Sequence, residues 1–211
     1  MSLRSAAARY RYYFGKYFVV IASLVLLGFA LFFYVGAERF RRDLRAKSPH
    51  LFYNDDQVTI TDVIDGDEMR IVKKGGQSTM LRLLGIKAFD PTGNVFLFPR
   101  YGEMAIQYIQ KRFLGLQGRI RLATPKTDTR GRLLATLLFP NKGNKEYTVD
   151  VGLELIARGL AITYVKYKFP DRMKYIRAEK QAMEQRLGLW ANAEASKMAR
   201  ALQSMWRKET D

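Results

Sequence analysis

The pattern of apolar and polar residues begins with a long stretch that carries no charge. Residues 17–37 are apolar or uncharged throughout. A helix of this length, at 1.5 Å per residue, spans about the 30 Å hydrocarbon thickness of a bilayer. Val35-Gly36-Ala37 resembles the end of a cleaved signal peptide, but the apolar cores of such peptides usually hold about 7–15 residues. We therefore predict a retained transmembrane helix over residues 17–37.

Both flanks of this stretch are basic. Residues 1–16 contain four basic side chains and no acid, which is typical of a mitochondrial targeting leader or of a positive flank that orients the helix. Residues 38–54 are expected to form a charged juxtamembrane helix and linker. Because basic residues lie on both sides, the sequence does not predict which side of the membrane carries the rest of the chain.

The middle of the chain, residues 55–191, changes to short alternating segments. Strands are expected over residues 57–64, 69–73, 78–86, 118–123 and 133–139. Helices are expected over residues 101–114, 149–158 and 170–187. This order predicts an α+β domain, with a five-stranded OB-type Greek-key barrel and three helices.

The last segment, residues 192–211, has the pattern of an amphipathic helix. Its apolar stripe consists of Met198, Leu202, Met205 and Trp206. Such a stripe suits docking to another protein or to a membrane surface. The alternative is a frayed extension of the domain.

The amino-acid composition excludes several kinds of metal site and catalytic site. The chain has no cysteine, which excludes disulfides and thiolate zinc sites. The single histidine, His50, precedes the predicted domain, so catalysis by histidine within that domain is excluded. A formal net charge of +16 is compatible with nucleic acid, an anionic membrane surface or acidic protein partners.

Several short motifs follow one another in the predicted domain. Asp65-Gly66-Asp67 forms a turn, a strand ends in Arg82-Leu83-Leu84-Gly85, and Asp128-Thr129-Arg130-Gly131-Arg132 comes later. Residues 154–161 and 187–190 add Glu-Leu-Ile-Ala-Arg-Gly-Leu-Ala and Leu-Gly-Leu-Trp. In this order the motifs resemble the staphylococcal (thermonuclease-like) nuclease family over about residues 57–191.

That resemblance implies hydrolysis of DNA and RNA with calcium. It matches Asp67 to a direct calcium ligand and Asp65 to the neighbouring acidic turn residue. Arg82 and Arg132 match the pair that grips the scissile phosphate, a role that suits guanidinium groups because they donate two parallel hydrogen bonds. Asp90 falls where the family has a glutamate that activates water, and it is one methylene shorter.

Lys87 departs from the family pattern at the position of a second calcium-ligating aspartate. An ammonium group offers no oxygen ligand to calcium, and at about 4 Å each pair of unit charges interacts by about 4 kcal/mol near a protein surface. We therefore expect an ion pair with Asp65 and Asp67 in place of a metal. Two alternatives stay open: Lys87 could bind a phosphate directly, or Glu103 could enter the site.

Aromatic and basic residues around this site leave further alternatives open. The family's stacking tyrosine corresponds to Arg130, so that platform is lost. Tyr164 and Tyr167 match other aromatic contacts of the family or pack at a strand end. Lys166 and Lys168 begin a basic cluster that binds phosphates or forms a solvated helix face.

Two functions from different classes follow. The first is a single-pass membrane protein with an inactive nuclease-like domain. It would be an accessory subunit of a complex in the mitochondrial inner membrane, with the lipid bilayer and other subunits as partners and no cofactor. The alternative is a membrane-tethered, calcium-dependent endonuclease acting on nucleic acid.

Overall fold

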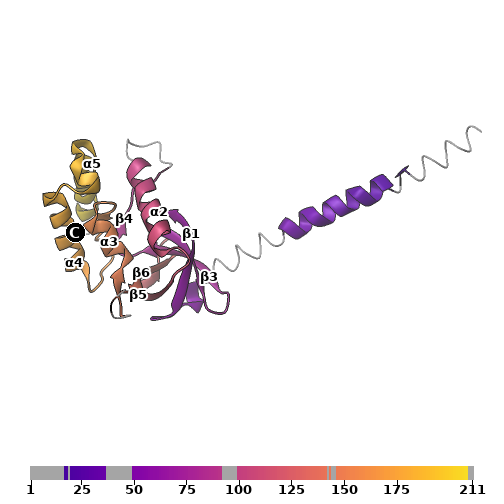
Figure 1. Cartoon of the computed structure of the whole chain (residues 1–211), viewed down its shortest axis with the longest axis horizontal. Coiled ribbons are helices and arrows are strands. Elements are labelled where there is room, and N and C mark those ends of the chain that lie inside the picture. The colour runs from indigo at the N-terminus through magenta and orange to yellow at the C-terminus, as the bar shows by residue number, and fades with distance from the viewer. Residues whose placement is uncertain are drawn as a thin grey trace, which may run out of the picture. The chain divides into compact units, whose positions relative to one another are not determined.

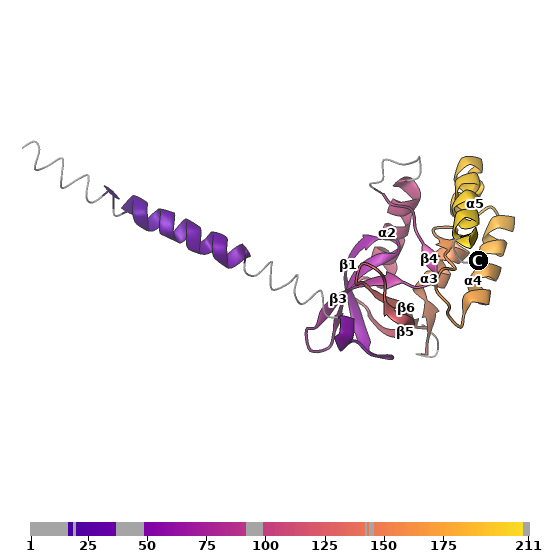
Figure 2. The same ribbon diagram turned by 180° about the vertical axis from the view of Figure 1, so that it is seen from behind.

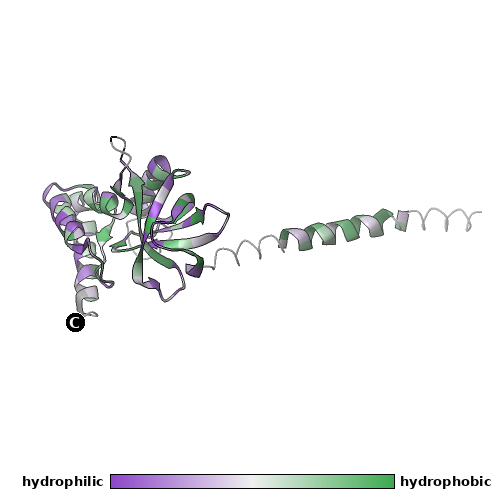
Figure 3. Ribbon diagram, turned by 90° about the horizontal axis from the view of Figure 1, so that it is seen from below, coloured by the Kyte–Doolittle hydropathy of each residue, from purple (hydrophilic) through white to green (hydrophobic). Residues whose placement is uncertain are grey.

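The structure is a computed structural model that describes residues 17–18, 20–36, 49–91, 99–141, 143 and 146–208. The chain divides into two units, Met1–Leu44 and Arg45–Asp211. In the first unit, residues 20–36 are helical, and apolar residues occupy most of the helix (Figure 3).

Among the described residues, no helix is both long enough and apolar enough to cross a bilayer. The transmembrane helix expected over residues 17–37 therefore stays a prediction. The expected leader over residues 1–16 and most of the expected juxtamembrane helix lie outside the described residues.

The second unit is built on a closed five-stranded barrel. Its strands are β1 (Gln57–Asp65), β2 (Glu68–Lys73), β3 (Ser78–Leu83), β5 (Gln117–Thr127) and β6 (Leu133–Pro140). They pair in the order β3-β2-β1-β5-β6, and a parallel pairing between β3 and β6 closes the barrel. This α+β architecture fits the predicted OB type.

Alternation of apolar and polar residues places the barrel core. Ile60, Ile71, Leu81, Ile120 and Leu137 come from five different strands, and each is fully buried. Because successive side chains of a strand point to opposite faces, one face of each strand fills the barrel and the other faces outward.

A helix packs against the turn that joins β1 to β2. This helix, α2 (Pro99–Phe113), buries Ala105, Ile109 and Phe113. A Cβ atom added at Gly66, in the turn, would lie 2.6 Å from the Cβ of Ala88 and 2.7 Å from the Cβ of Ala105. The absence of a side chain at Gly66 therefore lets the turn lie directly on α2.

The short 3-10 helix η1 (Pro49–Leu51) precedes β1, and β7 (Tyr147–Asp150) pairs with β6 at the edge of the sheet. A helical layer follows, made of α3 (Val151–Ala157), β8 (Ile162–Thr163), α4 (Arg172–Glu184), the 3-10 helix η2 (Gly188–Ala191) and α5 (Ala193–Lys208). Figures 1 and 2 show α3, α4 and α5 gathered on one side of the barrel, away from β3. A second buried cluster holds this layer together, formed by Ile162, Ala182, Leu189, Trp190, Ala195 and Ala199.

Three details differ from the expectations. Residues 149–150, expected to begin a helix, belong to strand β7, and Asp150 caps α3 by accepting a hydrogen bond from the Leu153 amide. The expected strand over residues 78–86 ends at Leu83, because Gly85 turns the chain with φ of +80°. Ile86–Lys87 then form β4, which pairs with β8.

The C-terminal segment differs as well. We expected its apolar stripe to be available to a partner, but Met198, Leu202 and Trp206 pack against the second buried cluster of the same chain. Met205 is the exception, with 57% of its surface exposed. Helix α5 is therefore a layer of the folded unit.

Candidate functional site

A pocket of about 590 Å³ opens where four segments meet: the β1–β2 turn, β4 and the loop after it, the loop before β6, and the segment after β8. Its lining consists of Ile64, Asp65, Glu68, Arg82, Lys87, Asp90, Pro91, Asp128, Thr129, Arg130, Arg132, Tyr164, Lys166 and Tyr167. The structure thus brings together most of the site candidates expected from sequence. Asp67, Glu103 and Lys168 are the candidates that do not line the pocket.

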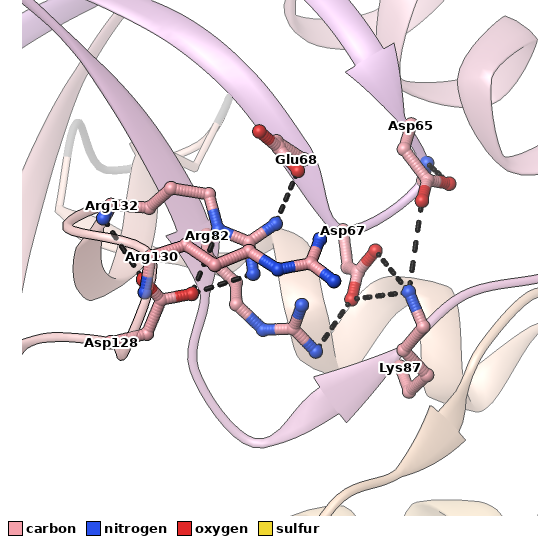
Figure 4. A network of polar contacts seen from close by, with 9 residues as sticks. Asp65, Asp67, Glu68, Arg82, Lys87, Asp128, Arg130 and Arg132 are labelled. Carbon is pink, nitrogen blue, oxygen red and sulfur yellow. Dashed lines mark hydrogen bonds and ion pairs between the residues drawn. The ribbon is translucent and has the colours of Figure 1, made fainter. Parts of the chain in front are cut away.

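Asp67 lies beneath the pocket and has 1% of its surface exposed. One of its oxygens lies 3.1 Å from Nη2 of Arg82. Lys87 Nζ donates to both carboxylate oxygens, at 3.2 Å and 3.3 Å (Figure 4). Because a buried carboxylate must be paired to stay ionised, the two cations complete the environment of Asp67.

Asp65 extends the same network. Its carboxylate lies 3.7 Å from Lys87 Nζ and accepts a hydrogen bond from the Gly66 amide. Burial, followed by the negative charge of Asp67, raises the pKa of Asp65 to about 6, although Lys87 acts in the opposite direction. Asp65 is therefore close to half-protonated near pH 6, and Lys87 serves two carboxylates at once.

Arg132 forms a second network on the opposite wall. Its Nη2 lies 2.6 Å from Asp128, its Nε donates to the same oxygen at 2.8 Å, and its Nη1 contacts Glu68 (Figure 4). Burial raises the pKa of Asp128, but hydrogen bonds from the side chain and backbone of Arg132 outweigh it, so this pKa is lowered. Arg132 is thus held by two carboxylates of the chain itself.

Tyrosines line the side of the pocket nearest the helical layer. The Arg82 guanidinium lies 5.7 Å from the centre of the Tyr164 ring, within the range of a cation–π contact. Tyr164 also meets the ring of Tyr167 edge to face, at 6.3 Å. The two tyrosines therefore pack against each other and line the pocket. Their match to the aromatic contacts of the family stays a prediction.

Charges of the pocket nearly cancel. The cations of the lining are Arg82, Lys87, Arg130, Arg132 and Lys166, and its acids are Asp65, Glu68, Asp90 and Asp128. With Asp67 beneath them, five acidic residues face five basic ones. Most of the cationic side chains that would attract a phosphate are already paired with acids of the chain.

The residues present do not fit a calcium ion. Calcium requires six to eight oxygen ligands at about 2.3–2.6 Å, whereas the buried carboxylate at this position is in contact with an ammonium group. Within the described ranges, no group of three or more histidine, cysteine, aspartate or glutamate side chains could hold a metal ion.

Sequence reasoning missed Glu68 and Asp128 as members of the site. A signal existed for both. Asp128 precedes Arg132 by four residues in the quoted turn motif. Glu68 directly follows the Asp65-Gly66-Asp67 turn in the sequence, and in the structure it pairs in register with Arg82. The contact of Trp206 with Tyr164, at 4.7 Å, had no local signal in the sequence.

Comparison with protein-family models finds a match over about half of the chain. The model described as Staphylococcal nuclease homologue matches residues 80–192. The matched range contains Arg82, Lys87, Asp90 and Arg132, and it ends before α5. No curated protein matches the chain significantly.

Proposed function

The chain belongs to the family of staphylococcal nuclease homologues, and on that premise we propose that its domain no longer cleaves nucleic acid with calcium. The protein acts instead as a single-pass accessory subunit of a membrane complex, in the mitochondrial inner membrane. The family supplies the barrel, and the site has changed from a metal pocket to an internally paired charge network.

One observation carries this proposal. Lys87 Nζ lies within 3.3 Å of both oxygens of Asp67, the carboxylate that matches a direct calcium ligand. A divalent cation bound there would have to displace the lysine and then tolerate its charge nearby. Neutralisation by Lys87 and Arg82 also satisfies the buried acid without a metal.

Calcium titration of the full-length protein tests the proposal. We expect the wild type to show no calcium-binding heat at millimolar calcium, and the Lys87→Asp variant to bind calcium with at least tenfold higher affinity. Lys168→Asp is the matched control, because it makes the same change of charge at an exposed residue outside the pocket lining. Tight calcium binding by the wild type would refute the proposal.

A second candidate function, a membrane-tethered calcium-dependent endonuclease, is favoured by a different observation. Arg82, Arg132 and Asp90, which match the catalytic residues of the family, line the same pocket. The full-length protein should be incubated with single-stranded DNA and with RNA, in calcium and in chelator. Cleavage that chelator prevents and that Arg132→Ala abolishes would establish this function, and no cleavage in either condition would remove it.

Membrane attachment has its own support in the uncharged stretch over residues 17–37. On alkaline carbonate extraction we expect the full-length chain to stay in the membrane pellet, and release into the supernatant would contradict attachment. The basic, acid-free residues 1–16 support the mitochondrial location. Import into isolated mitochondria, followed by protease protection, tests that location.

The proposed role as a subunit of a larger complex rests on the proposed attachment to a membrane and the proposed loss of the metal site. After solubilisation in mild detergent, native gels should show the chain in a complex far larger than its own 24.4 kDa. Migration as the free chain in its detergent micelle would contradict the assembly role.

A further inference from the structure

Helix α5 lies beyond the range matched by the family model, yet it reaches the pocket wall. The Trp206 ring meets Tyr164 edge to face, with ring centres 4.7 Å apart and planes at 85°. The Tyr164 ring also contacts the Arg82 guanidinium, which in turn pairs with Asp67. A chain of contacts therefore runs from the last helix to the buried acid of the site.

A second set of contacts joins α5 to the same wall through the Gln203 side chain. Gln203 Nε2 donates to the two oxygens of Glu179 at 2.8 Å and 2.9 Å, and it lies 3.4 Å from the carbonyl oxygen of Thr163. Glu179, with 7% of its surface exposed, also accepts a hydrogen bond from the Thr163 amide at 2.8 Å. Gln203 and Glu179 together hold strand β8.

Strand β8 joins two parts of the pocket wall, because it pairs with β4 and leads directly into Tyr164. Its residue Ile162 pairs with Lys87, and Thr163 pairs with Ile86. Tyr164 follows directly, and its amide donates to the carbonyl oxygen of Gly85 at 2.9 Å. A two-residue strand pair has few hydrogen bonds of its own, so its position depends on what packs against it.

Helix α5 is itself held in place by packing and by a capping hydrogen bond. Ala195 and Ala199 are fully buried against α4 and η2 in the second cluster. The Asn192 side chain accepts a hydrogen bond from the Ala195 amide at 3.0 Å, which satisfies a free donor of the first turn. The helix thus presents Gln203 and Trp206 to β8 and Tyr164 from a fixed base.

From these contacts we propose that α5 is a positioning element of the pocket, in which Trp206 fixes the Tyr164 ring over Arg82 and Gln203 fixes the β4–β8 strand pair. The pocket of this chain is then incomplete without a helix that the matched family region lacks. Helix α5 has this positioning role whether the pocket cleaves, binds or only takes part in assembly, because the role concerns the geometry of the wall.

Hydrogen exchange on the full-length protein, read by mass spectrometry, tests the proposal. In Trp206→Ala and in Gln203→Ala, we expect amides of residues 85–87 and 162–164 to exchange at least tenfold faster than in the wild type. Amides of β5 and β6 should keep their rates, because neither strand pairs with β4 or β8. Trp206→Phe should restore slow exchange, because a phenyl ring can still meet Tyr164 edge to face.

Met205→Ala is the matched control, since Met205 neighbours Trp206 on α5 and is 57% exposed. A spectroscopic signature complements the exchange: loss of the Trp206 ring current should shift the Tyr164 ring protons in Trp206→Ala and not in Met205→Ala. Unchanged exchange over 85–87 and 162–164, or faster exchange throughout the barrel, would overturn the proposal. The first would leave Trp206 without influence on the wall, and the second would make its role one of general stability.

Discussion

At the scale of the residue, Asp65 and Asp67 share the ammonium group of Lys87. This sharing decides how the site responds to pH. Arg82 adds a second cation to Asp67, whereas Lys87, at 3.7 Å, is the one cation paired with Asp65 in the described part of the chain. Burial consequently raises the pKa of Asp65 to about 6, compared with 3.8 for the unperturbed group. The folded state therefore binds a proton on Asp65 more tightly than the unfolded state does.

The sign of the resulting pH dependence follows from proton linkage. Between pH 4 and 6 the folded state holds more protons at Asp65, so the free energy of unfolding falls as pH rises through this range. Asp65→Asn should remove this contribution, which is on the order of 1 kcal/mol after allowance for solvent screening. Urea unfolding at pH 4, 5, 6 and 7 measures it.

Asp62→Asn provides the control for that titration, because Asp62 lies on the same strand and is exposed. Equal slopes of unfolding free energy against pH in the wild type and in Asp65→Asn would contradict the assignment.

Tyr175 and Asp150 give a second prediction at the residue scale. The Tyr175 hydroxyl lies 2.9 Å from both oxygens of Asp150, and both residues are buried. Tyr175→Phe removes this donor and leaves the buried carboxylate short of a partner, which should lower the free energy of unfolding by about 1–3 kcal/mol. Chemical denaturation measures the loss, and Tyr53→Phe, at a residue 62% exposed, should change nothing.

At the scale of the element, the turn between β1 and β2 depends on the small size of Gly66. A methyl group there would meet Ala88 and Ala105 at less than 3 Å, so the turn would have to move away from α2. Gly66→Ala should lower the free energy of unfolding by about 1–3 kcal/mol, the usual effect of overpacking. It should also weaken the Lys87 contacts of Asp65 and Asp67, which flank the glycine.

Gly143→Ala is the matched control, since nothing lies within 4 Å of a Cβ atom at that position. Differential scanning calorimetry compares the two variants, and equal melting temperatures would show that the turn is not packed as tightly as the contacts indicate.

Some elements of the fold could be predicted from the sequence, and others could not. The five barrel strands follow from alternation. The Lys87–Asp67 ion pair follows from the family resemblance, which places an ammonium group among carboxylates, so both were predictable. Strands β4 and β8 each contain two residues, too few for any periodicity. The helical pattern of α5 can be read from its own residues. Its packing against Ala182 and Trp190 depends on tertiary structure, which that pattern does not specify.

At the scale of the whole molecule, the proposed function gives the two units separate roles. All residues of the three buried clusters, from Phe52 to Ala199, belong to the unit Arg45–Asp211. No described residue of the first unit belongs to these clusters. Folding of the barrel and helical layer should therefore not depend on the first 44 residues, whereas attachment to a membrane should depend on them entirely.

Deletion of residues 1–44 tests this separation. The shortened chain keeps every residue of the core, including Phe52, which is fully buried, and Tyr53, whose ring lies 5.3 Å from Lys73 Nζ and 5.1 Å from Lys126 Nζ. Its melting temperature should stay within about 2 °C of the full-length value, because a change of 1 kcal/mol shifts a domain of this size by only about 2–4 °C. On carbonate extraction it should move from the pellet to the supernatant. Retention in the pellet would mean that the folded unit binds the membrane by itself, and a large fall in melting temperature would mean that the first unit contributes to the fold.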